Sequence, residues 1–567
     1  MLEAVAGAPL DAASLDRWRA LVGEACAALG WPVPALAAHG HPGGASLVLS
    51  APIDQLFAAT EVNEWAWQRA AGAHDGFHAP GHPASWDDAS ALETLRRLAR
   101  GERAPALTAL VEAAQAHGLD ATIDDDTLSI GEGRWSRAWP TDALPTPADV
   151  PWRVLQSIPK ALVTGSNGKT TTVRLIAAAL RARGLHVGHS CTDGVFVDGV
   201  AIASGDWSGP AGARSVLRHP AVEAAVLETA RGGILRRGLA VRRADVAVVT
   251  GISADHFGEY GVHDLDDLAE VKLTVARAID ARGLLVLNAD DTTLRRHAAR
   301  LTCPLGWFAR DHAHPLLHAH RAIGGRTAGV HAGELLLSHG EATHSLGRIE
   351  AMPLTLGGLA GYNIANLAGA AVAAAALGVP AATLAALFAR FGSEHADNTG
   401  RLQRWRFGNT IVLLDYAHNP EGLDALLGIA QRLRGGGRLG LLLGQAGNRD
   451  DEAVRALAAT AARHRPDRVV LKDIAGFLRG RAPGEIAAVL RGPLLAGGLD
   501  PGAIDTVLDE ANAARALVGW ASDGDIIVLP THGTQARERV SRWLDGLTAS
   551  GWRAGAALVE LPALPAG

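Results

Sequence analysis

The sequence predicts an α/β fold: two open, mainly parallel sheets that follow a smaller N-terminal α+β domain. The first observation is a set of short, uninterrupted apolar runs, which are typical of strands buried on both faces of a parallel sheet. The second is that helical stretches separate these runs, as in βαβ units. The runs form two series along the chain: Ala161–Val163, Ala224–Leu227, Val246–Val249 and Leu284–Leu287, and then Ile411–Leu414, Leu441–Leu443, Val469–Leu471 and Ile526–Leu529.

The chain is too long for a single hydrophobic core, because 567 residues favour several domains. The segment Thr141–Pro151 has three prolines in eleven residues and is interpreted as a linker. The α/β pattern begins after it, and the second series of strands begins near Arg401. We therefore expect an N-terminal accessory domain over 1–150, a central domain over 151–398 and a C-terminal domain over 399–567.

Composition and charge exclude several classes of protein. Apolar residues make up 48% and charged residues 20%, which is ordinary for a globular protein, and the formal net charge is −6. Such a chain has no basic field for nucleic acid or an anionic membrane. The three cysteines form no CxxC pair, and no apolar run reaches the roughly 18 residues of a membrane span. We expect a cytoplasmic protein without nucleic-acid or membrane partners; a homo-oligomer is left open.

Polar side chains stand at or just past the ends of many predicted strands. Ligands of open α/β sheets bind beyond the carboxyl ends of the strands, so this placement indicates a binding site at that edge of each sheet. The residues are Thr164, Glu228, Thr250, Asn288, Asp415 and Asp473.

A glycine-containing loop follows the first of these strands and opens a helix that is predicted to run to about Arg183. The loop residues are Gly165, Ser166, Asn167, Gly168, Lys169, Thr170 and Thr171. Glycines let the backbone approach phosphate oxygens, and the start of a helix binds anions. Lys169 can reach the β- and γ-phosphates of ATP, and the Thr170 hydroxyl can ligate Mg²⁺. Val163 stands where the general Walker pattern has glycine, so the alternative is a glycine turn with a chance GKT.

The compact TGSNGKTTT form of this loop resembles the Mur ligase superfamily, and further matches follow in the order of that family. They are Leu227–Gly233, Ser253–His256, Lys272, Gly361–Asn366, Gly400-Arg401 and Asp415–Pro420. The likeness is strongest to the Mur-type half of the cyanophycin synthetases, through Thr192–Val195, Gly205–Pro210, ETARGGILRRGL from Glu228 and LRGRAPGE from Leu478. It covers roughly residues 157 to 535. Residues 106–140 also resemble the end of the N-terminal domain of those enzymes, but the chain has no room for their ATP-grasp part.

Two positions depart from the family pattern. Gly251 stands where an Asn often precedes the Asp-His element, and Ser166 replaces a common Thr. The first of these departures leaves one contact of the family's active site in question.

The resemblance implies a Mur ligase-like central P-loop domain, a Rossmann-like C-terminal domain, and an ADP-forming ligase of carboxylates and amines. It implies ATP and Mg²⁺, with Lys169, Glu228, His256 and Lys272 as catalytic residues. The metal-binding residues would be Thr170, Glu228, His256 and Lys272, the last as a carbamoylated lysine. Without the resemblance, a strand-end Glu, a lone His and a helical Lys would be interpreted as a capping, a structural and a solvated residue.

The remaining site residues are also implied by the resemblance. The nucleotide-binding residues would be the loop residues above together with Asn363, Asn366, Arg401 and Asp415. The substrate-binding residues would be Thr192, Asp193, Arg231, His418 and Asn419. Each group has a structural alternative: helix capping for the two asparagines, a solvated arginine for Arg401, and an Asn-Pro turn for Asn419.

The resemblance therefore predicts an ATP-dependent amide-bond ligase that joins a small-molecule or peptide carboxylate to an amino acid or amine. A peptidoglycan or folylpolyglutamate type of ligase is the alternative among enzymes. A nucleotide-binding partner subunit without catalysis is the alternative from another class. The Trp65/Trp67 and Trp135/Trp139 pairs are interpreted as core packing rather than a binding surface.

Overall fold

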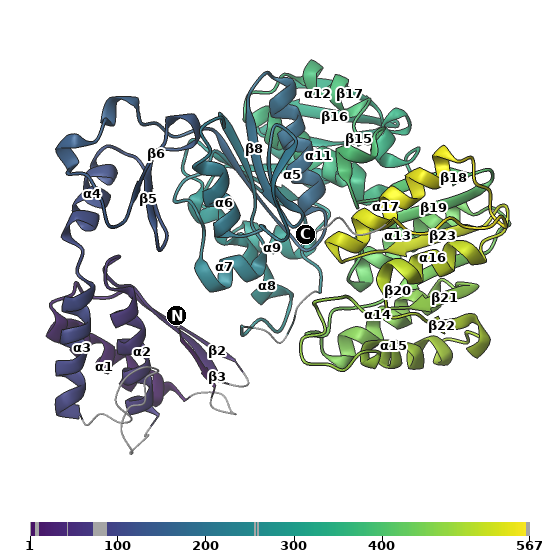
Figure 1. The fold of residues 1–567 in the computed structure, drawn as a ribbon. Helices are drawn as coiled ribbons and strands as arrows, with labels where there is room; N and C mark the ends of the chain where they lie inside the picture. Colours follow the sequence, from purple (N-terminus) through teal and green to yellow (C-terminus); the bar gives the residue numbers. More distant parts are fainter. Residues whose placement is uncertain are drawn as a thin grey trace.

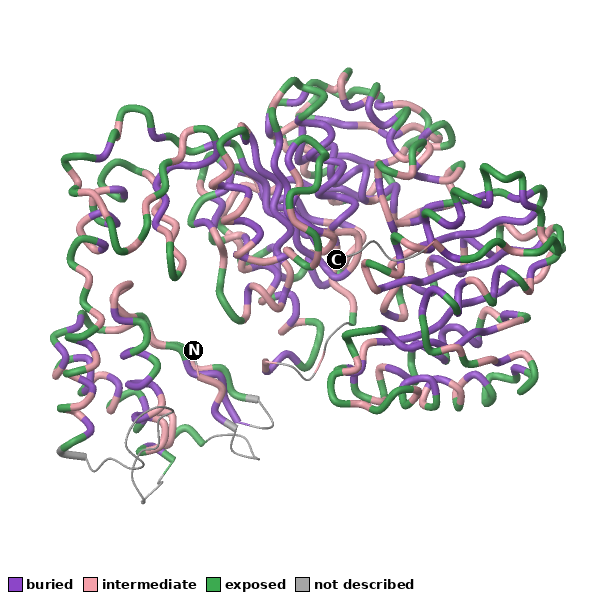
Figure 2. The backbone as a smooth tube through the Cα atoms, in the orientation of Figure 1, coloured by how far each residue is buried: buried purple, intermediate pink, exposed green. Residues whose placement is uncertain are grey.

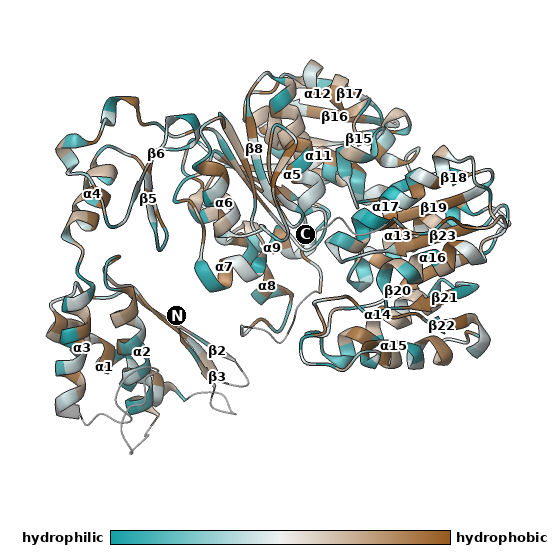
Figure 3. Ribbon diagram, in the orientation of Figure 1, coloured by the Kyte–Doolittle hydropathy of each residue, from teal (hydrophilic) through white to brown (hydrophobic). Residues whose placement is uncertain are grey.

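The computed structural model describes residues 2–5, 11–41, 44–71, 88–254, 257 and 260–562. These residues form two large α/β units preceded by two small α+β units (Figure 1). The central strands of both large sheets run through the buried interior (Figure 2), and these strands are largely hydrophobic (Figure 3). Among the described residues, no helix is long and apolar enough to cross a membrane.

The central unit is built on an 11-stranded sheet with the order β10-β9-β8-β11-β7-β12-β13-β14-β15-β16-β17. The strands from β8 to β15 in this order pair in parallel, and antiparallel hairpins extend both edges. Their bounds are β7 Lys160–Thr164, β8 Val187–Cys191, β9 Gly194–Val197, β10 Val200–Ser204, β11 Ala224–Glu228, β12 Val246–Val249, β13 Leu284–Asn288, β14 Leu305–Asp311, β15 Arg326–His331, β16 Glu334–His339 and β17 Ala342–Arg348.

Helices cover both faces of this sheet, because successive side chains of a buried strand point to opposite faces. Ala161 and Val163 of β7 pack in the core that contains α5, α11 and α12, whereas Leu162 packs in the core that contains α6, α8, α9 and α10. The helices are α5 Lys169–Ala182, α6 Pro210–Leu217, α7 Arg231–Arg237, α8 Leu265–Leu273, α9 Thr292–Ala298, α10 Pro315–Ala322, α11 Gly361–Ala376 and α12 Ala381–Phe388.

The C-terminal unit has a six-stranded sheet with the order β18-β19-β23-β20-β21-β22, parallel except for β18. The strands are β18 Gln403–Phe407, β19 Thr410–Asp415, β20 Leu439–Leu443, β21 Arg468–Leu471, β22 Ile504–Thr506 and β23 Ile526–Pro530. One face packs against α13 Pro420–Leu433, α14 Asp451–Arg463 and α15 Glu485–Ala496. The other face packs against α16 Glu510–Trp520 and α17 Thr534–Ala549.

The N-terminal residues form two separate hydrophobic cores. The first combines β1 Leu2–Val5, β2 Leu36–His41 and β3 Gly44–Leu49 with α1 Ala12–Leu29, α2 Leu56–Ala70 and α3 Asp88–Glu102. The second combines α4 Pro105–Ala116 with β4 Ala121–Ile123, β5 Thr127–Ile130 and β6 Arg137–Pro140. All four tryptophans of the predicted pairs belong to or pack against hydrophobic cores, which confirms their structural interpretation.

The structure confirms the predicted fold class, and every predicted strand is present within two residues of its expected bounds. The edge hairpins of the central sheet were not predicted. Two of their strands, β10 and β17, are largely exposed on the surface: β17 contains no apolar run, and the run Val200–Ala203 of β10 is not buried. The domain boundaries at residues 150 and 398 stay a prediction.

A buried ion pair connects the second N-terminal core to the central sheet. Lys160, the first residue of β7, donates from Nζ to Glu132 Oε2 at 2.6 Å, and both side chains are almost fully buried. The same carboxylate oxygen accepts the backbone N–H of Ile158 at 3.0 Å. The strand that leads into the phosphate loop is therefore tied at its start to the N-terminal part of the chain.

Lys160→Met is expected to lower the free energy of unfolding by about 3 kcal/mol, because loss of one partner leaves the other charge buried and unpaired. Burial already raises the pKa of Glu132 against the opposing effect of Lys160. When a carboxyl group has a raised pKa in the folded state, the folded protein loses stability as pH rises through that pKa. The fall in melting temperature should therefore be larger at pH 8 than at pH 5. Lys160→Met/Glu132→Gln should recover most of it, and equal melting temperatures for Lys160→Met and wild type would contradict the assignment.

Candidate active site

The predicted phosphate loop lies between the end of β7 and the start of α5. Gly168 is the N-cap of α5 with φ +82°, and Gly165 has φ +140°. A Cβ atom on Gly168 would lie 2.2 Å from Oδ1 of Asn366, and one on Gly165 would lie 1.9 Å from Oγ1 of Thr250. Both positions therefore require glycine for their backbone conformation and for the close approach of neighbouring side chains. This confirms the strand–loop–helix context that the sequence predicts.

Gly168→Ala is expected to weaken ATP binding at least about tenfold, because the added Cβ must displace Asn366 and strain a left-handed backbone by about 1–2 kcal/mol. Calorimetric titration with ATP and Mg²⁺ measures the effect. Gly546→Ala is the matched control, since this glycine lies within α17 and an added Cβ there has no atom within 4 Å. Wild-type affinity in Gly168→Ala would contradict the loop assignment.

Glu228 ends β11, which lies between β8 and β7 in the sheet, and is buried. Its Oε2 accepts from the Thr170 hydroxyl at 2.8 Å, and its Oε1 accepts from the Thr192 hydroxyl at 2.9 Å. The structure thus brings together three of the predicted residues as a compact set of oxygen atoms, of the kind that Mg²⁺ prefers. Within the described ranges, no group of three or more His, Cys, Asp or Glu side chains could hold a metal ion. His256, which is also predicted to bind the metal, lies outside the described residues.

Both predicted lysines lie at the phosphate loop. Lys169, the first residue of α5, donates from Nζ to the carbonyl oxygen of Ser166 at 3.1 Å. Lys272, near the end of α8, is buried and donates from Nζ to the carbonyl oxygen of Gly165 at 2.8 Å. The alternative interpretation of Lys272 as a solvated helix residue is therefore wrong. Ser166, the departure from the family pattern, exchanges hydrogen bonds of 3.0 Å with the backbone of Ser253.

Asn363 and Asn366 lie one turn apart on α11, and both are buried. Asn366 Nδ2 donates to Asn363 Oδ1 at 3.1 Å, and Asn363 Nδ2 donates to the carbonyl oxygen of Leu354 at 3.0 Å. The N-cap of α11 is Ala360, without a side-chain hydrogen bond, so the helix-capping alternative is wrong for both asparagines.

The C-terminal unit contributes Arg401 and Asp415. Arg401 lies 4.3 Å above the ring of Tyr416, and its Nη2 is 3.4 Å from the Thr170 hydroxyl across the unit boundary. The Asp415 carboxylate ends β19 and accepts the backbone N–H groups of Leu402 and Ala417 at 2.7 and 2.8 Å. Burial raises the pKa of Asp415, although Arg401 and these backbone donors oppose the rise. The solvated-arginine alternative for Arg401 is wrong, since its side chain is only 13% exposed.

A cleft of about 880 Å³ lies between the central and C-terminal units, and both units line it. Many predicted residues line this cleft together: Ser166, Asn167, Gly168, Lys169, Thr170, Thr171, Thr192, Glu228, Asn363, Asn366, Arg401, Asp415 and His418. The remaining described ones do not belong to its lining: Gly165, Asp193, Arg231, Lys272 and Asn419. Two further strand-end residues noted in the sequence, Thr250 and Asn288, also line the cleft, as do Asp290, Asp291 and Tyr416.

Asn419 contacts the phosphate loop across the cleft rather than lining it. Its Oδ1 caps α13 by accepting from the backbone N–H of Gly422 at 2.9 Å, and its Nδ2 donates to Asn167 Oδ1 at 2.9 Å. Asn167 Nδ2 in turn donates to Glu421 at 2.7 Å. The start of α13 therefore rests on the phosphate loop. Its neighbour His418 donates from Nδ1 to the carbonyl oxygen of Tyr416 at 3.2 Å.

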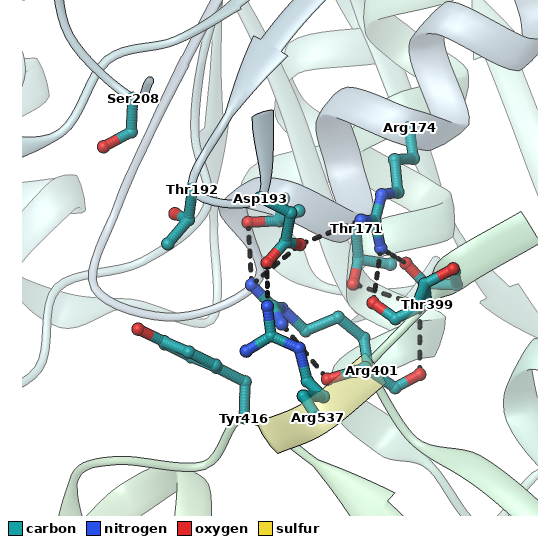
Figure 4. Close-up of polar contacts among 12 residues, drawn as sticks. Thr171, Arg174, Thr192, Asp193, Ser208, Thr399, Arg401, Tyr416 and Arg537 are labelled. Atoms are coloured by element: carbon teal, nitrogen blue, oxygen red, sulfur yellow. Dashed lines mark hydrogen bonds and ion pairs between the residues drawn. The ribbon is translucent and has the colours of Figure 1, made fainter. Parts of the chain in front are cut away.

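Two predicted substrate-binding residues, Asp193 and Arg231, do not line the cleft. Arg231 is the first residue of α7 and is buried. Asp193 follows β8 and binds three arginines, Arg174, Arg401 and Arg537, of which the sequence analysis named only Arg401 (Figure 4). No sequence motif reveals Arg174 or Arg537, because each belongs to an ordinary helical pattern.

The fold and the site define a P-loop protein of two α/β domains that form one cleft between them. Comparison with known families agrees: residues 163–374 match the Mur ligase middle domain, and residues 400–531 match the Mur ligase glutamate ligase domain. These two matches cover more than half of the chain. The chain belongs to the Mur ligase superfamily.

Individual relatives are similar over the same region. Cyanophycin synthetase of Trichormus variabilis is 35% identical over 381 residues, which cover 67% of this chain and 42% of that enzyme. The UDP-N-acetylmuramoyl-L-alanyl-D-glutamate–2,6-diaminopimelate ligase of Xanthomonas campestris pv. campestris is 29% identical over 401 residues, 67% of this chain and 73% of that one. The solved structure of E. coli FolC in complex with DHPP and ADP has 20% identity and a TM-score of 0.49, and covers 69% of this chain and 89% of that one.

The match leaves much of the cyanophycin synthetases without a counterpart, since the aligned region spans 42–44% of their length. What those enzymes do as whole proteins is therefore not transferred to this chain by the likeness alone.

Proposed function

We propose that this protein is an ATP-dependent amide-bond ligase that activates a carboxylate as an acyl phosphate and couples it to an amino acid or amine. The observation that carries the proposal is the cleft between the domains, where the phosphate loop, the Glu228 oxygens and Arg401 meet. Family membership supports the same reaction class. The alternative of a partner subunit without catalysis has no support in the site, because Lys169, Thr170 and Glu228 are present and adjacent to one another.

The residues of the cleft suit ATP with a divalent cation. Gly165 and Gly168 have no room for a Cβ, so the loop backbone is free to approach the phosphates. The Thr170 hydroxyl and the Glu228 carboxylate provide oxygen ligands, which Mg²⁺ prefers. We assign two Mg²⁺ ions to this region, held by Thr170, Glu228 and His256, with a carbamoylated Lys272 as a ligand of the second ion. When bound, Mg²⁺ neutralises charge on the phosphate oxygens. Asn363 and Asn366 would contact adenine, and Asp415 the ribose.

The proposed reaction has two displacements. A carboxylate oxygen of the first substrate attacks the γ-phosphorus of ATP, the bond to the bridging oxygen breaks, and ADP leaves. The amine nitrogen of the second substrate then attacks the acyl carbon, phosphate leaves with the electron pair, and the nitrogen loses a proton to solvent. Lys169 and Arg401 stabilise the charge that spreads over the transferred phosphoryl oxygens. Closure of the two domains over the cleft excludes water, which would otherwise hydrolyse the acyl phosphate.

A screen of carboxylates against amines tests the proposal. Release of ADP that requires both a carboxylate and an amine, together with a product mass equal to their sum minus water, is the expected result. Aspartate-containing acceptors with arginine come first, because the similar enzymes are cyanophycin synthetases. Muramoyl peptides and pteroyl glutamates represent the alternative ligase types. ADP release at equal rate without any acceptor would contradict ligation and favour a simple ATPase.

A related expectation concerns polymer growth. The N-terminal likeness to the cyanophycin synthetases ends near Pro140 and the phosphate loop begins at Thr164, so the chain has no room between them for the ATP-grasp part of those enzymes. We expect the protein to add single units to a preformed acceptor, with ATP, Mg²⁺, free aspartate and free arginine giving no polymer. Mass analysis that finds a long two-amino-acid polymer without an added acceptor would contradict this expectation.

A further inference from the structure

Three guanidinium groups from three separate segments converge on the carboxylate of Asp193 (Figure 4). Arg174 of α5 donates to Oδ2 at 2.8 Å, Arg401 approaches the same oxygen at 3.3 Å, and Arg537 of α17 donates to Oδ1. All four side chains are at most 13% exposed. Arg401 and Arg537 both lie against the ring of Tyr416, at 4.3 and 5.1 Å from its centroid. We call these residues the Asp193 cluster.

The Asp193 cluster joins the two domains at their connection. Asp193 and Arg174 belong to the central domain, whereas Arg401 and Arg537 belong to the C-terminal domain. Arg174 also donates to the carbonyl oxygen of Thr399, within the connecting segment, at 2.8 Å. In the same segment, Gly400 has φ +70°, and a Cβ there would lie 2.4 Å from Cδ of Arg537. Helix α17 therefore packs on the connection through the same arginine that binds Asp193.

The cluster also touches the phosphate end of the cleft. Arg401, held by Asp193, lies 3.4 Å from the Thr170 hydroxyl. The residue before Asp193 is Thr192, whose hydroxyl donates to Glu228. A displacement of Asp193 would therefore move Arg401, which lies beside Thr170, and would also move Thr192, which binds Glu228.

We propose that Asp193 is a positioning residue that couples the closed placement of the C-terminal domain to the geometry of the phosphate site. It binds Arg537, which fixes α17 against the domain connection, and it orients Arg401 beside Thr170. Both carboxylate oxygens are occupied by guanidinium groups, so Asp193 acts through these arginines rather than by touching a substrate. The catalytic part of this inference rests on the proposed ligase function, whereas its conformational part does not.

Electrostatics explains why the carboxylate is needed at this position. Burial by itself would raise the pKa of Asp193, but Arg401, Arg537 and Arg174 lower it to about 2, so the group is ionised at any physiological pH. Without this charge, three buried cations would face one another, and like charges repel strongly where water is excluded. The domains would relieve the repulsion by separating, because two of the three cations belong to the C-terminal domain.

The test compares Asp193→Asn, which removes the charge at constant shape, with Asp198→Asn as a matched control. Asp198 lies five residues further on and bonds His186 and the Val187 backbone within the central domain only. Spin labels at the exposed positions Val200 and Leu508, one in each domain, report the interdomain distance with and without ADP and Mg²⁺ in a Cys303→Ser background. Steady-state kinetics with the acceptor and amine found in the screen give kcat and KM.

We expect Asp193→Asn to lengthen and broaden the interdomain distance and to lower kcat about 100-fold, because small displacements of positioned groups cost rates of this order. The KM of the acceptor should change much less. Asp198→Asn should match wild type in both measurements, and Asp193→Glu should recover part of the loss. Arg537→Gln should lengthen the distance in the same way, and Asp193→Asn/Arg537→Gln should lose little more than either single variant, since the two act as one unit.

The outcomes separate this inference from the proposed function. An unchanged distance distribution in both Asp193→Asn and Arg537→Gln overturns the positioning role, whatever happens to kcat. A wild-type kcat in Asp193→Asn also overturns it. If wild type forms no amide with any acceptor while the distance still shifts in the variants, the ligase proposal fails and the role of Asp193 in closure stands. Should Asp193→Asn fail to fold, Arg537→Gln decides, because it leaves Asp193 paired with Arg174 and Arg401.

Discussion

Lys169→Ala is expected to lower the rate of ligation by about 10²–10³-fold or more, the cost of removing one preorganised group that stabilises charge in the transition state. Lys169 begins α5 at the phosphate loop and lines the cleft within the loop whose glycines admit no side chain. Its amine donates to the backbone carbonyl oxygen of Ser166 at 3.1 Å. The measurement is ADP release in the presence of both substrates, with circular dichroism to show that the fold is retained.

Arg181→Ala is the control for this prediction. Arg181 lies on the last turn of the same helix and is exposed to solvent, far along α5 from the phosphate loop. Its loss should leave ligation within about twofold of wild type, as for most surface substitutions. A Lys169→Ala variant that turned over at the wild-type rate would show that the loop does not bind the phosphates of ATP.

Lys272→Ala is expected to abolish ligation to a similar extent, and small carboxylic acids such as acetate or formate are expected to restore part of it. The prediction follows from our proposal that Lys272 carries a carbamate whose oxygens help to hold Mg²⁺. The structure supports it by placing the amine in a buried position 2.8 Å from the phosphate-loop carbonyl of Gly165. Activity of the variant is measured as a function of acid concentration, at constant pH and ionic strength.

Lys272→Arg distinguishes a carbamate from an ammonium group. Arginine keeps the positive charge and a donor toward Gly165, but it does not form a carbamate, so the variant should be as inactive as Lys272→Ala. Wild-type activity in Lys272→Arg would contradict the carbamate. So would electron density for an unmodified amine at Lys272 in an active crystal with ATP and Mg²⁺.

The interior of the fold could be predicted from the sequence because its strands are buried on both faces. Runs such as Val246–Val249 contain only apolar residues, and the structure assigns β12 to the same four residues. The edge strands are not buried on both faces. Val200–Ser204 forms β10 with most of its side chains exposed, although Val200–Ala203 are all apolar, so a short apolar run does not by itself distinguish an exposed edge strand from a buried one. Its pairing with β9 is determined by the hairpin and the neighbouring sheet, which no local pattern describes.

Some residues of the site could likewise be predicted from the sequence, and others could not. The phosphate loop could be predicted because its backbone requires glycine at positive φ, which leaves a local signal. The position of Glu228 at a strand end follows from the apolar run before it, but its proposed role came only from the family resemblance. The Asp193 cluster has no local signal. Its arginines come from positions 174, 401 and 537, and only the tertiary structure brings them to one carboxylate.

The ion pair between Lys160 and Glu132 limits where the protein can be truncated at its N-terminal side. A truncation that begins at the phosphate-loop domain, near residue 151, would keep the lysine and delete its carboxylate. It would also uncover Ile158, which packs in the core beneath β7 and donates its backbone N–H to the same carboxylate. The truncated protein would then have Lys160 unpaired at the start of β7, the strand that leads into the phosphate loop. We therefore expect a stably folded fragment of the two α/β domains to extend back at least to Glu132.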